Sequence, residues 1–412
     1  MKTCGQSGLV AVLSAATCAV TLAFAAIALG ARATPGAKAD EAPTVTKTSY
    51  GATSSGVAVD EYTLTNAHGL TVKIITYGGI IASIDNPSAK MPDIVLGFRN
   101  LRDYETKNSP HFGAIIGRYA NRIANGVFSL DGVTYCLDAN NGPNTLHGGF
   151  KGFDTKVWTV TRVIQDGKEG GVELHYLSPA GDGWTNTAPN PNCPSGATYG
   201  FPGNLDTYVT YTLNNQDQLT IRYSAKTDAP TVVSLTNHSY WNLSGEGTGT
   251  TYRHVLTLNA DAITPVDSGL IPDGTTRAVE GTVFDFRKGK AVGDSIRDAD
   301  PQLVYAGGFD HNWIVNKPKS TEKLAWAATV YDPESKRTLK IFTDQPGIQF
   351  YAGNSLDGKV YGASGREYRQ SDGLALETEH YPDSPNHPNF PTTVLLPGQT
   401  YQATTIFELP EK

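Results

Sequence analysis

The 412 residues carry a formal net charge of −7, and Lys and Arg form no cluster, which excludes the basic surface that nucleic-acid binding requires. The length is ample for a large buried core. The four cysteines form no C-x-x-C pair and no Cys/His set with metal-site spacing, so the sequence predicts no metal centre.

Residues 1–33 have the pattern of a signal peptide. Lys2 precedes a mostly apolar segment over residues 9–29, and residues 31–33 form a small-x-small cleavage pattern. The apolar segment is longer than is usual, so an uncleaved membrane anchor is the alternative. Cleavage would leave a secreted or periplasmic protein without stable membrane contact. Residues 34–45 are small and polar and contain proline, which predicts a disordered lead-in.

Residues 46–412 are predicted to form a single all-β domain. Length alone would suggest two domains, but large β-sandwiches are an exception, and no linker interrupts this region. Turn residues separate the strands at short intervals, and long segments with a 3.6-residue period are hard to find. Many short strands favour a sandwich or a barrel. The clearest expected strands, alternating or rich in β-branched and aromatic residues, lie at 69–79, 170–178, 205–214, 218–227, 254–260 and 337–344.

One long segment interrupts this rhythm. Residues 182–204 are rich in Pro, Asn and Gly, and loops of this length are uncommon unless they are functional or disordered. Cys193 lies within the segment, and Cys136 is the only other cysteine outside the leader. In an oxidising compartment the two could form a disulfide, and otherwise they are unrelated thiols.

Five stretches hold polar residues that the strand pattern does not require. They lie at 117–123, 144–149, 236–243 and 307–313, and at 347–354 together with 376–387. Each has an ordinary structural explanation when taken alone, such as a turn, a cap, a buried hydrogen bond or a surface ion pair. Glu377 is less ordinary, because it follows an apolar run and a buried carboxylate is costly. The candidate site residues in these stretches are Asn121, Arg122, His147, His238, Asp310, Gln349 and Glu377.

Together these residues have the composition of a sugar pocket. Such pockets combine flat apolar faces, here expected from Tyr240, Trp241 and Trp313, with fixed donors and acceptors for hydroxyl groups. A His and a Glu can supply an acid and a base near neutral pH. A carboxylate close to His238 would raise the pKa of that imidazole and help it act as the acid.

The motifs that carry these residues occur in a characteristic order: GRYANRIANGVF, NTLHGG, KGFD, TNHSYWNL, GFDHNW, PGIQFYAGN and LETEHYPDSPNHPNFP. In order and approximate spacing, the chain after about residue 50 resembles the aldose 1-epimerase, or galactose mutarotase, family. The resemblance implies a large antiparallel β-supersandwich of the galactose mutarotase type, with the site in an open cleft.

The resemblance also implies residue roles. His238 would be the general acid at the ring oxygen, Glu377 the general base at the anomeric hydroxyl, and His147 an assisting group near the ring oxygen. The sugar hydroxyls would be bound by Asn121, Arg122, Asp310 and Gln349. The implied enzyme is an isomerase of hexose metabolism that interconverts the α and β anomers of free hexoses such as glucose and galactose. Ring opening and reclosure involve no redox change or group transfer, so no cofactor is expected, and a monomer or dimer would suffice.

Two features depart from the family pattern. The 182–204 segment is longer than its family counterpart, which leaves the preferred aldose open, and Trp241 stands where the family often has Phe. Two N-glycosylation patterns, at Asn237 and Asn242, fall on the proposed site, and we interpret them as chance matches that are unmodified or inaccessible.

Three alternative functions stay open at this point. A glycoside hydrolase would need a second carboxylate flanking the bond, and Asp310 is the candidate. A non-catalytic sugar-binding protein could use the same scaffold. An epimerase of phosphorylated sugars would need more basic residues in the pocket than Arg122 alone.

Overall fold

The computed structural model describes residues 41–186, 190–317 and 324–409. The description below concerns the described residues of the compact unit that spans Lys38–Lys412. The predicted signal peptide and residues 34–40 of the predicted lead-in lie outside the described residues. Within those residues, no helix has the length and apolar character needed to cross a membrane.

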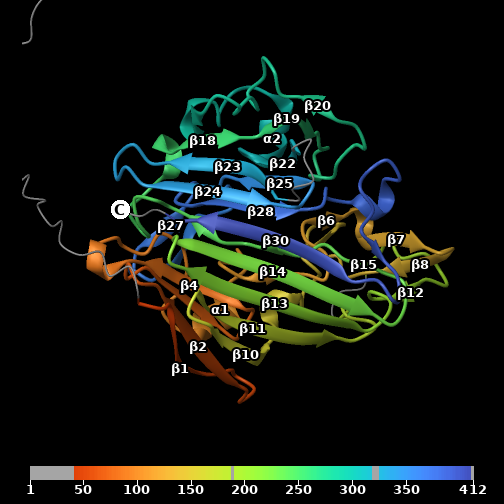
Figure 1. Ribbon diagram of the computed structural model, residues 1–412. Helices are drawn as coiled ribbons and strands as arrows, with labels where there is room; N and C mark the ends of the chain where they lie inside the picture. The colour runs from red at the N-terminus through yellow and green to blue at the C-terminus, as the bar shows by residue number, and fades with distance from the viewer. Residues whose placement is uncertain (1–40, 187–189, 318–323, 410–412) are drawn as a thin grey trace, which may run out of the picture. The chain divides into compact units, whose positions relative to one another are not determined.

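The largest sheet in the described part of the chain has nine antiparallel strands (Figure 1). Its strands alternate buried and partly exposed side chains, as β13 does with Leu205 and Val209 buried and Asp206 outward. This period of two follows from the pleat and gives the sheet one face for the core. In sheet order the strands are β10 (Thr159–Gln165), β11 (Glu169–Ser178), β13 (Leu205–Asn214), β14 (Gln218–Thr227), β30 (Tyr401–Glu408), β24 (Thr338–Thr343), β23 (Ala325–Tyr331), β18 (Val255–Leu258) and β21 (Lys290–Ala291).

A six-stranded antiparallel sheet packs against the nine-stranded one, again counting described residues only. The rings of Trp241 and Phe407 lie 5.0 Å apart between centroids, and the hydroxyls of Thr378 and Thr405 hydrogen-bond at 2.5 Å across the two sheets. One hydrophobic cluster takes side chains from both sheets. In sheet order the strands are β17 (Tyr240–Trp241), β28 (Leu374–Glu379), β25 (Gly347–Tyr351), β22 (Asp310–Val315), β19 (Ala260–Thr264) and β20 (Arg277–Ala278).

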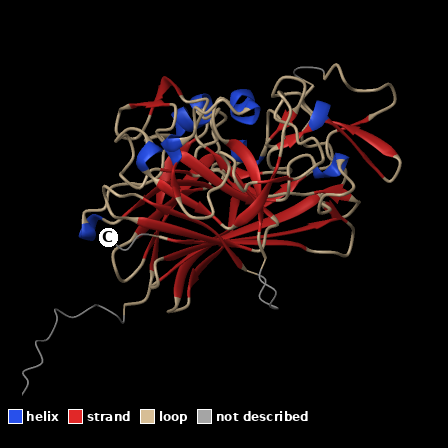
Figure 2. Ribbon diagram, turned by 90° about the horizontal axis from the view of Figure 1, so that it is seen from above, coloured by secondary structure: helices blue, strands red, loops and turns tan. Residues whose placement is uncertain are grey.

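Smaller sheets and short helices complete the described chain, and Figure 2 shows the helices as brief segments within the loops. A third antiparallel sheet contains β1 (Thr44–Ala52), β2 (Ala58–Thr65), β3 (Thr71–Ile75) and β4 (Ile80–Asp85). The remaining strands are β5 (Ile115–Ile116), β6 (Arg122–Ile123), β7 (Val127–Leu130), β8 (Val133–Cys136), β9 (Thr145–Leu146), β12 (Thr198–Tyr199), β15 (Thr231–Val232), β16 (Thr236–Asn237), β26 (Asp357–Tyr361), β27 (Glu367–Arg369) and β29 (Val394–Leu395). The helices are α1 (Leu101–Lys107), α2 (Pro301–Ala306), and the 3-10 turns η1 (Pro87–Ala89), η2 (Ala124–Gly126), η3 (Phe153–Thr155), η4 (Thr251–Arg253), η5 (Val292–Asp294) and η6 (Ser384–Asn386).

The all-β prediction and the family fold that the resemblance implies are confirmed, and each of the six expected strands overlaps a strand of the structure. One boundary differs. β1 begins at Thr44, so residues 44 and 45 of the predicted lead-in are part of a strand. Thr44 and Val45 pair with Thr65 and Leu64 of β2, and Val45 packs on the main core. A β-branched pair therefore extends the strand past the point where composition predicted disorder.

Cys136 and Cys193 form a disulfide, which settles the pairing that the sequence left open. The bond joins β8 to the 182–204 segment, whose described residues pack on the β7–β8 hairpin. The Asn190 side-chain amide donates hydrogen bonds to the carbonyls of Asn125 and Leu137, at 2.7 and 3.1 Å. β12 pairs in parallel with β8. The segment therefore braces the stretch of chain that leads from Cys136 towards His147.

We expect loss of this disulfide to destabilise the protein by about 4 kcal/mol, because the closed loop restricts the unfolded chain. The separation of 57 residues sets that magnitude. Urea unfolding of the Cys136→Ala/Cys193→Ala variant measures the change. Reductant should lower the wild-type midpoint and leave the variant unaffected, and an equal response in both would show that the bond does not contribute.

Candidate active site

Strand register gathers one set of site residues on a single face of the six-stranded sheet. Tyr240 pairs with Ala375, Gln349 with Glu377, and Asp310 with Tyr351. Side chains directly opposite each other on paired strands point to the same face, and so do residues two apart on one strand. Tyr240, Glu377, Tyr351 and Asp310 therefore share a face, and all four line one pocket.

The same alternation sends two of the predicted aromatics the other way. Trp241 and Trp313 are fully buried in the core, and neither lines the pocket. The expectation that they provide sugar-stacking faces is therefore wrong. Tyr240 is on the pocket wall as predicted, and Tyr351 supplies a second aromatic side chain there, which sequence reasoning missed.

Two loops bring in the histidine and arginine side of the pocket. Arg122 lies on β6, which pairs with β9 immediately before His147. The backbone N–H of His147 donates to the backbone carbonyl of Asn121 at 2.9 Å. The backbone N–H of Asn121 donates in turn to the ring atom Nδ1 of His147, at 3.2 Å. Gly148 follows with φ of 87°, and a Cβ there would lie 2.1 Å from the carbonyl oxygen of Gly117. Only glycine permits this turn, so the backbone aims His147 into the pocket.

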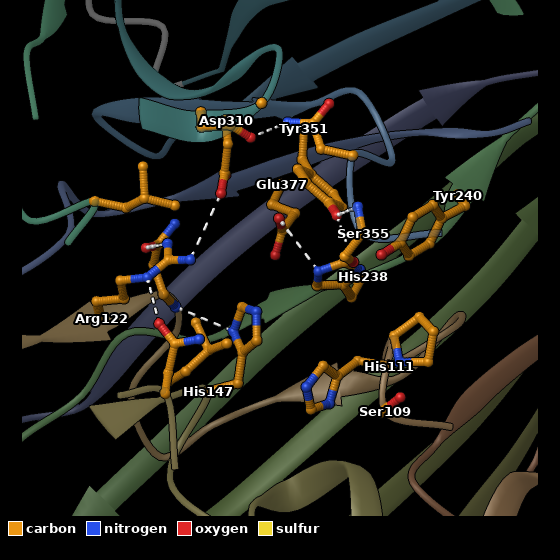
Figure 3. A pocket seen from close by; sticks show the side chains of 18 residues that line it. Ser109, His111, Arg122, His147, His238, Tyr240, Asp310, Tyr351, Ser355 and Glu377 are labelled. Atoms are coloured by element: carbon orange, nitrogen blue, oxygen red, sulfur yellow. Dashed lines mark hydrogen bonds and ion pairs between the residues drawn. The ribbon is translucent and has the colours of Figure 1, made fainter. Parts of the chain in front are cut away.

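The pocket has a volume of about 320 Å³, within the range of small-molecule sites. Figure 3 shows its polar side chains converging on one space from several elements. The wall comprises Ser109, Pro110, His111, Asn121, Arg122, Asn141, Leu146, His147, His238, Tyr240, Leu270, Ala306, Gly307, Asp310, Tyr351, Asn354, Ser355 and Glu377. Six of the seven predicted site residues are among them.

His238 and Glu377 meet in this pocket. His238 Nε2 lies 3.6 Å from Glu377 Oε1, and both side chains are buried. The backbone of His238 is held on both sides, since its N–H donates to Ala114 and its carbonyl accepts from Gly113. In the described part of the protein, His238 Nδ1 and Glu377 Oε2 have no hydrogen-bond partner. The pair therefore retains buried polar atoms that the described part of the protein does not satisfy.

Burial controls the protonation of this pair. Burial, with a smaller contribution from the neighbouring His111, lowers the pKa of His238 to about 3. Burial also raises the pKa of Glu377 well above 4.5, helped by the charges of Glu379 and Asp310. The expectation that the carboxylate would raise the pKa of His238 is wrong for the free pocket, because desolvation outweighs the attraction. Both shifts favour a neutral imidazole at His238 and a protonated carboxyl group at Glu377 in the free pocket.

His147 enters the pocket as a hydrogen-bond donor. Its Nδ1 accepts from the backbone N–H of Asn121, so the neutral ring carries its hydrogen on Nε2. Burial lowers the pKa of His147 well below 6.5, which keeps the ring neutral. One ring nitrogen each of His147 and His238 and a carboxylate oxygen of Glu377 lie within 4.8 Å of one another, close enough to be considered as metal ligands. The assigned tautomer gives this cluster an N–H group at His147 Nε2 where a metal ion would need a lone pair.

Arg122 is the centre of a polar network. Its guanidinium donates to Asn141 Oδ1 at 3.0 Å and to Asn121 Oδ1 at 3.2 Å, and it lies 3.6 Å from Asp310 Oδ2. Gln349 is not part of the pocket wall, and its role as a sugar ligand stays a prediction. Its Nε2 donates to Asp310 Oδ1 at 2.7 Å, so it positions that carboxylate from behind.

The sequence reasoning missed His111 and Asn141 on the pocket wall. His111 lies a few residues before the GRYANRI motif, and Asn141 lies shortly before NTLHGG. Their closeness to those motifs is the one signal that could have pointed to them. The two glycosylation patterns are buried, with the Asn237 amide donating to Gly113 and the Asn242 amide to Gly249. Their side chains are thus inaccessible in the folded protein.

Comparison with known proteins identifies the family. The family model for aldose 1-epimerase matches residues 60–408. Galactose mutarotase of Sus scrofa is 40% identical over 365 residues, which cover 88% of this chain and 98% of that protein. Aldose 1-epimerase of Escherichia coli (strain K12) is 36% identical over 351 residues, covering 84% and 94%. The crystal structure of galactose 1-epimerase from Lactobacillus acidophilus NCFM superposes with a TM-score of 0.75 at 27% identity, covering 89% and 98%. Because the family model spans the sandwich and these relatives match along almost their whole length, the chain belongs to the aldose 1-epimerase family.

Proposed function

We propose that the protein interconverts the α and β anomers of free hexoses such as glucose and galactose. The observation that carries the proposal is the buried pair of His238 Nε2 and Glu377 Oε1, 3.6 Å apart on the wall of a sugar-sized pocket. The relatives named above as galactose mutarotase and aldose 1-epimerase support the same reaction. Asp310, Arg122 and Asn121 would bind the sugar hydroxyls.

The reaction needs one proton acceptor and one proton donor. Glu377 takes the proton from the C1 hydroxyl while His238 gives a proton to the ring oxygen, and the C1–O5 bond breaks to leave an open-chain aldehyde. Rotation about C1–C2 turns the other carbonyl face towards the C5 hydroxyl. Reclosure returns one proton to His238 and one to O1. Each positioned proton transfer accelerates the reaction by about 10²–10⁴-fold.

Sugar binding prepares the pair for this step. The free pocket holds its proton on Glu377, whereas the reaction starts with the proton on His238. Hydroxyl groups that donate to the carboxylate stabilise its ionised form and so lower the pKa of Glu377. The proton can then move across the 3.6 Å to His238 without exchange with solvent. The pair titrates as a unit, and the state with a single proton is the active one.

Polarimetry on freshly dissolved α-D-glucose and α-D-galactose tests the proposal. We expect the approach to anomeric equilibrium to be faster with enzyme than in buffer alone. An aryl glycoside offered in parallel should release no aglycone, because release would indicate a hydrolase. A protein that binds these sugars without accelerating mutarotation would be a sugar-binding protein, and that result would contradict the proposal.

Activity should persist well below pH 6.5. The pair loses its single-proton state in acid only when His238 is protonated beside a neutral Glu377, and burial lowers the pKa of His238 to about 3. The profile of kcat/KM against pH, after subtraction of the spontaneous rate, should therefore stay level as the pH falls from 7 and decline only towards that value. A half-maximal point near pH 6.5 would show an ordinary imidazole instead.

We further propose that the protein works outside the cytoplasm. The leader pattern over residues 1–33 supports this, and so does the disulfide, because such bonds persist in oxidising compartments. Expression of the full chain in a bacterial host, followed by cell fractionation and N-terminal sequencing, tests it. Recovery of uncleaved protein in the cytoplasm would contradict the proposal.

A further inference from the structure

A third imidazole, that of His111, lines the pocket beside those of His147 and His238. The ring of His111 lies 4.9 Å from that of His147 and 5.9 Å from that of His238, between centroids. Figure 3 shows it on the wall that these histidines form. The mechanism above assigns it no role, although its side chain reaches the same space as the acid–base pair.

Asp154 fixes the orientation of His111. His111 Nδ1 lies 2.9 Å from Asp154 Oδ2, and Asp154, on η3, is buried. A carboxylate only accepts hydrogen bonds, so Nδ1 carries a hydrogen and, in the neutral ring, Nε2 presents a lone pair. The backbone is fixed too. The His111 N–H donates to Asn108, and in the same turn the Gly113 N–H donates to the carbonyl of His238.

His111 and His147 are complementary as neutral rings. His147 Nδ1 is occupied by the backbone of Asn121, so its Nε2 donates a hydrogen bond. His111 Nδ1 is occupied by Asp154, so in the neutral ring its Nε2 accepts one. A sugar hydroxyl is both donor and acceptor, and it can accept from His147 while it donates to His111. Two side chains fixed by separate buried partners thus form one hydroxyl-binding element.

The position of this element points to a particular hydroxyl. In Figure 3, His238 lies between Glu377 and His111. If Glu377 faces O1 and His238 faces the ring oxygen, the next atoms along the sugar are C5 and its C6 hydroxymethyl group. We propose, resting on the function proposed above, that His111 and His147 bind the C6 hydroxyl of the hexose and that His111 makes the protein select hexoses with a free C6 hydroxyl.

Mutarotation of D-glucose, 6-deoxy-D-glucose and D-xylose by the wild type and His111→Phe tests the proposal. We expect the wild type to prefer glucose over the other two sugars by about tenfold in kcat/KM, the net worth of one neutral hydrogen bond, and His111→Phe to lose that preference. In His111→Phe the KM for glucose should rise while kcat stays unchanged, because the hydroxyl contact is the same in the ground and transition states. His111→Gln keeps an acceptor at the end of its side chain and should retain part of the preference.

The matched control is His175→Phe. His175 also pairs with an aspartate, at 2.6 Å from Asp206 Oδ1, but it lies on β11 and does not line the pocket. The sugar preference of the His175→Phe variant should equal that of the wild type. If His111→Phe lowers kcat/KM equally for glucose and 6-deoxyglucose, His111 has a structural role and the proposal is overturned. An unchanged preference for glucose would overturn it as well.

Calorimetric binding of the same sugars separates this inference from the proposed function. The contact changes the ratio of the dissociation constants of glucose and 6-deoxyglucose whether or not the protein turns them over. A protein without mutarotase activity whose binding preference still depends on His111 would refute the function and support the contact. Normal mutarotation, with a ratio of dissociation constants that His111→Phe does not change, would support the proposed function and refute the contact.

Discussion

Replacement of Glu377 by Gln is expected to reduce kcat for mutarotation by about 10²–10⁴-fold, because the amide cannot accept the C1 hydroxyl proton. The side chain keeps its size and lies on the central part of β28, so the pocket should survive. Polarimetry gives the rate, and circular dichroism checks the fold. A near-wild-type rate would remove Glu377 from the mechanism.

Glu379→Gln is the matched control for this variant. Glu379 is two residues along the same strand, is fully buried, and accepts a hydrogen bond from the Asn121 side chain at 3.2 Å. It does not line the pocket, so its replacement leaves the proton acceptor in place. We expect a far smaller loss of rate. Equal losses in the two variants would point to the shared strand, not to the base.

The Glu377→Gln variant should also change how stability depends on pH. Burial raises the pKa of Glu377 in the folded protein, so the folded state binds more protons than the unfolded state above about pH 4.5. The stability that this group contributes is complete below that pH and is lost as the pH rises towards its folded pKa. Glutamine has no proton to lose. Urea unfolding of both proteins should therefore show that the free energy of unfolding of the variant rises relative to that of the wild type between pH 4.5 and neutrality.

Replacement of His238 by Ala should likewise reduce the activity by about 10²–10⁴-fold, because it removes the group that protonates the ring oxygen in the proposed mechanism. His238 is buried, so the substitution leaves a cavity that opens into the pocket. Added imidazole should occupy that space and restore part of the rate beyond its own solution catalysis. An active His238→Ala protein, or one whose loss of rate follows loss of fold by circular dichroism, would contradict the acid role.

The sequence predicted the site better than it predicted the surroundings of each residue. Motif order placed His147, His238 and Glu377 together, and the structure brings all three to one pocket. Resemblance could not say how far from the cavity each side chain lies. Gln349 illustrates this, because it shares the pocket side of its strand pair with Glu377 yet lies behind Asp310. Its distance from the cavity depends on packing between strands.

The pKa shifts in the site were the property that the sequence predicted least well. The sequence suggested that a nearby carboxylate would raise the pKa of His238, but the size of the desolvation effect depends on how completely the folded chain encloses the ring. His111 was missed for a related reason. Its importance comes from contacts with Asp154 and His147, which are 43 and 36 positions away. No local pattern records such contacts.

The division of the pocket between sheet and loops has a consequence for how new specificities could arise. Glu377, Asp310 and Tyr351 stand on neighbouring strands whose register is fixed along their length. Asn141, Leu270 and Ala306 reach the cavity from outside that sheet. A mutant library confined to these three positions could therefore explore other aldoses while the reaction chemistry stays unchanged.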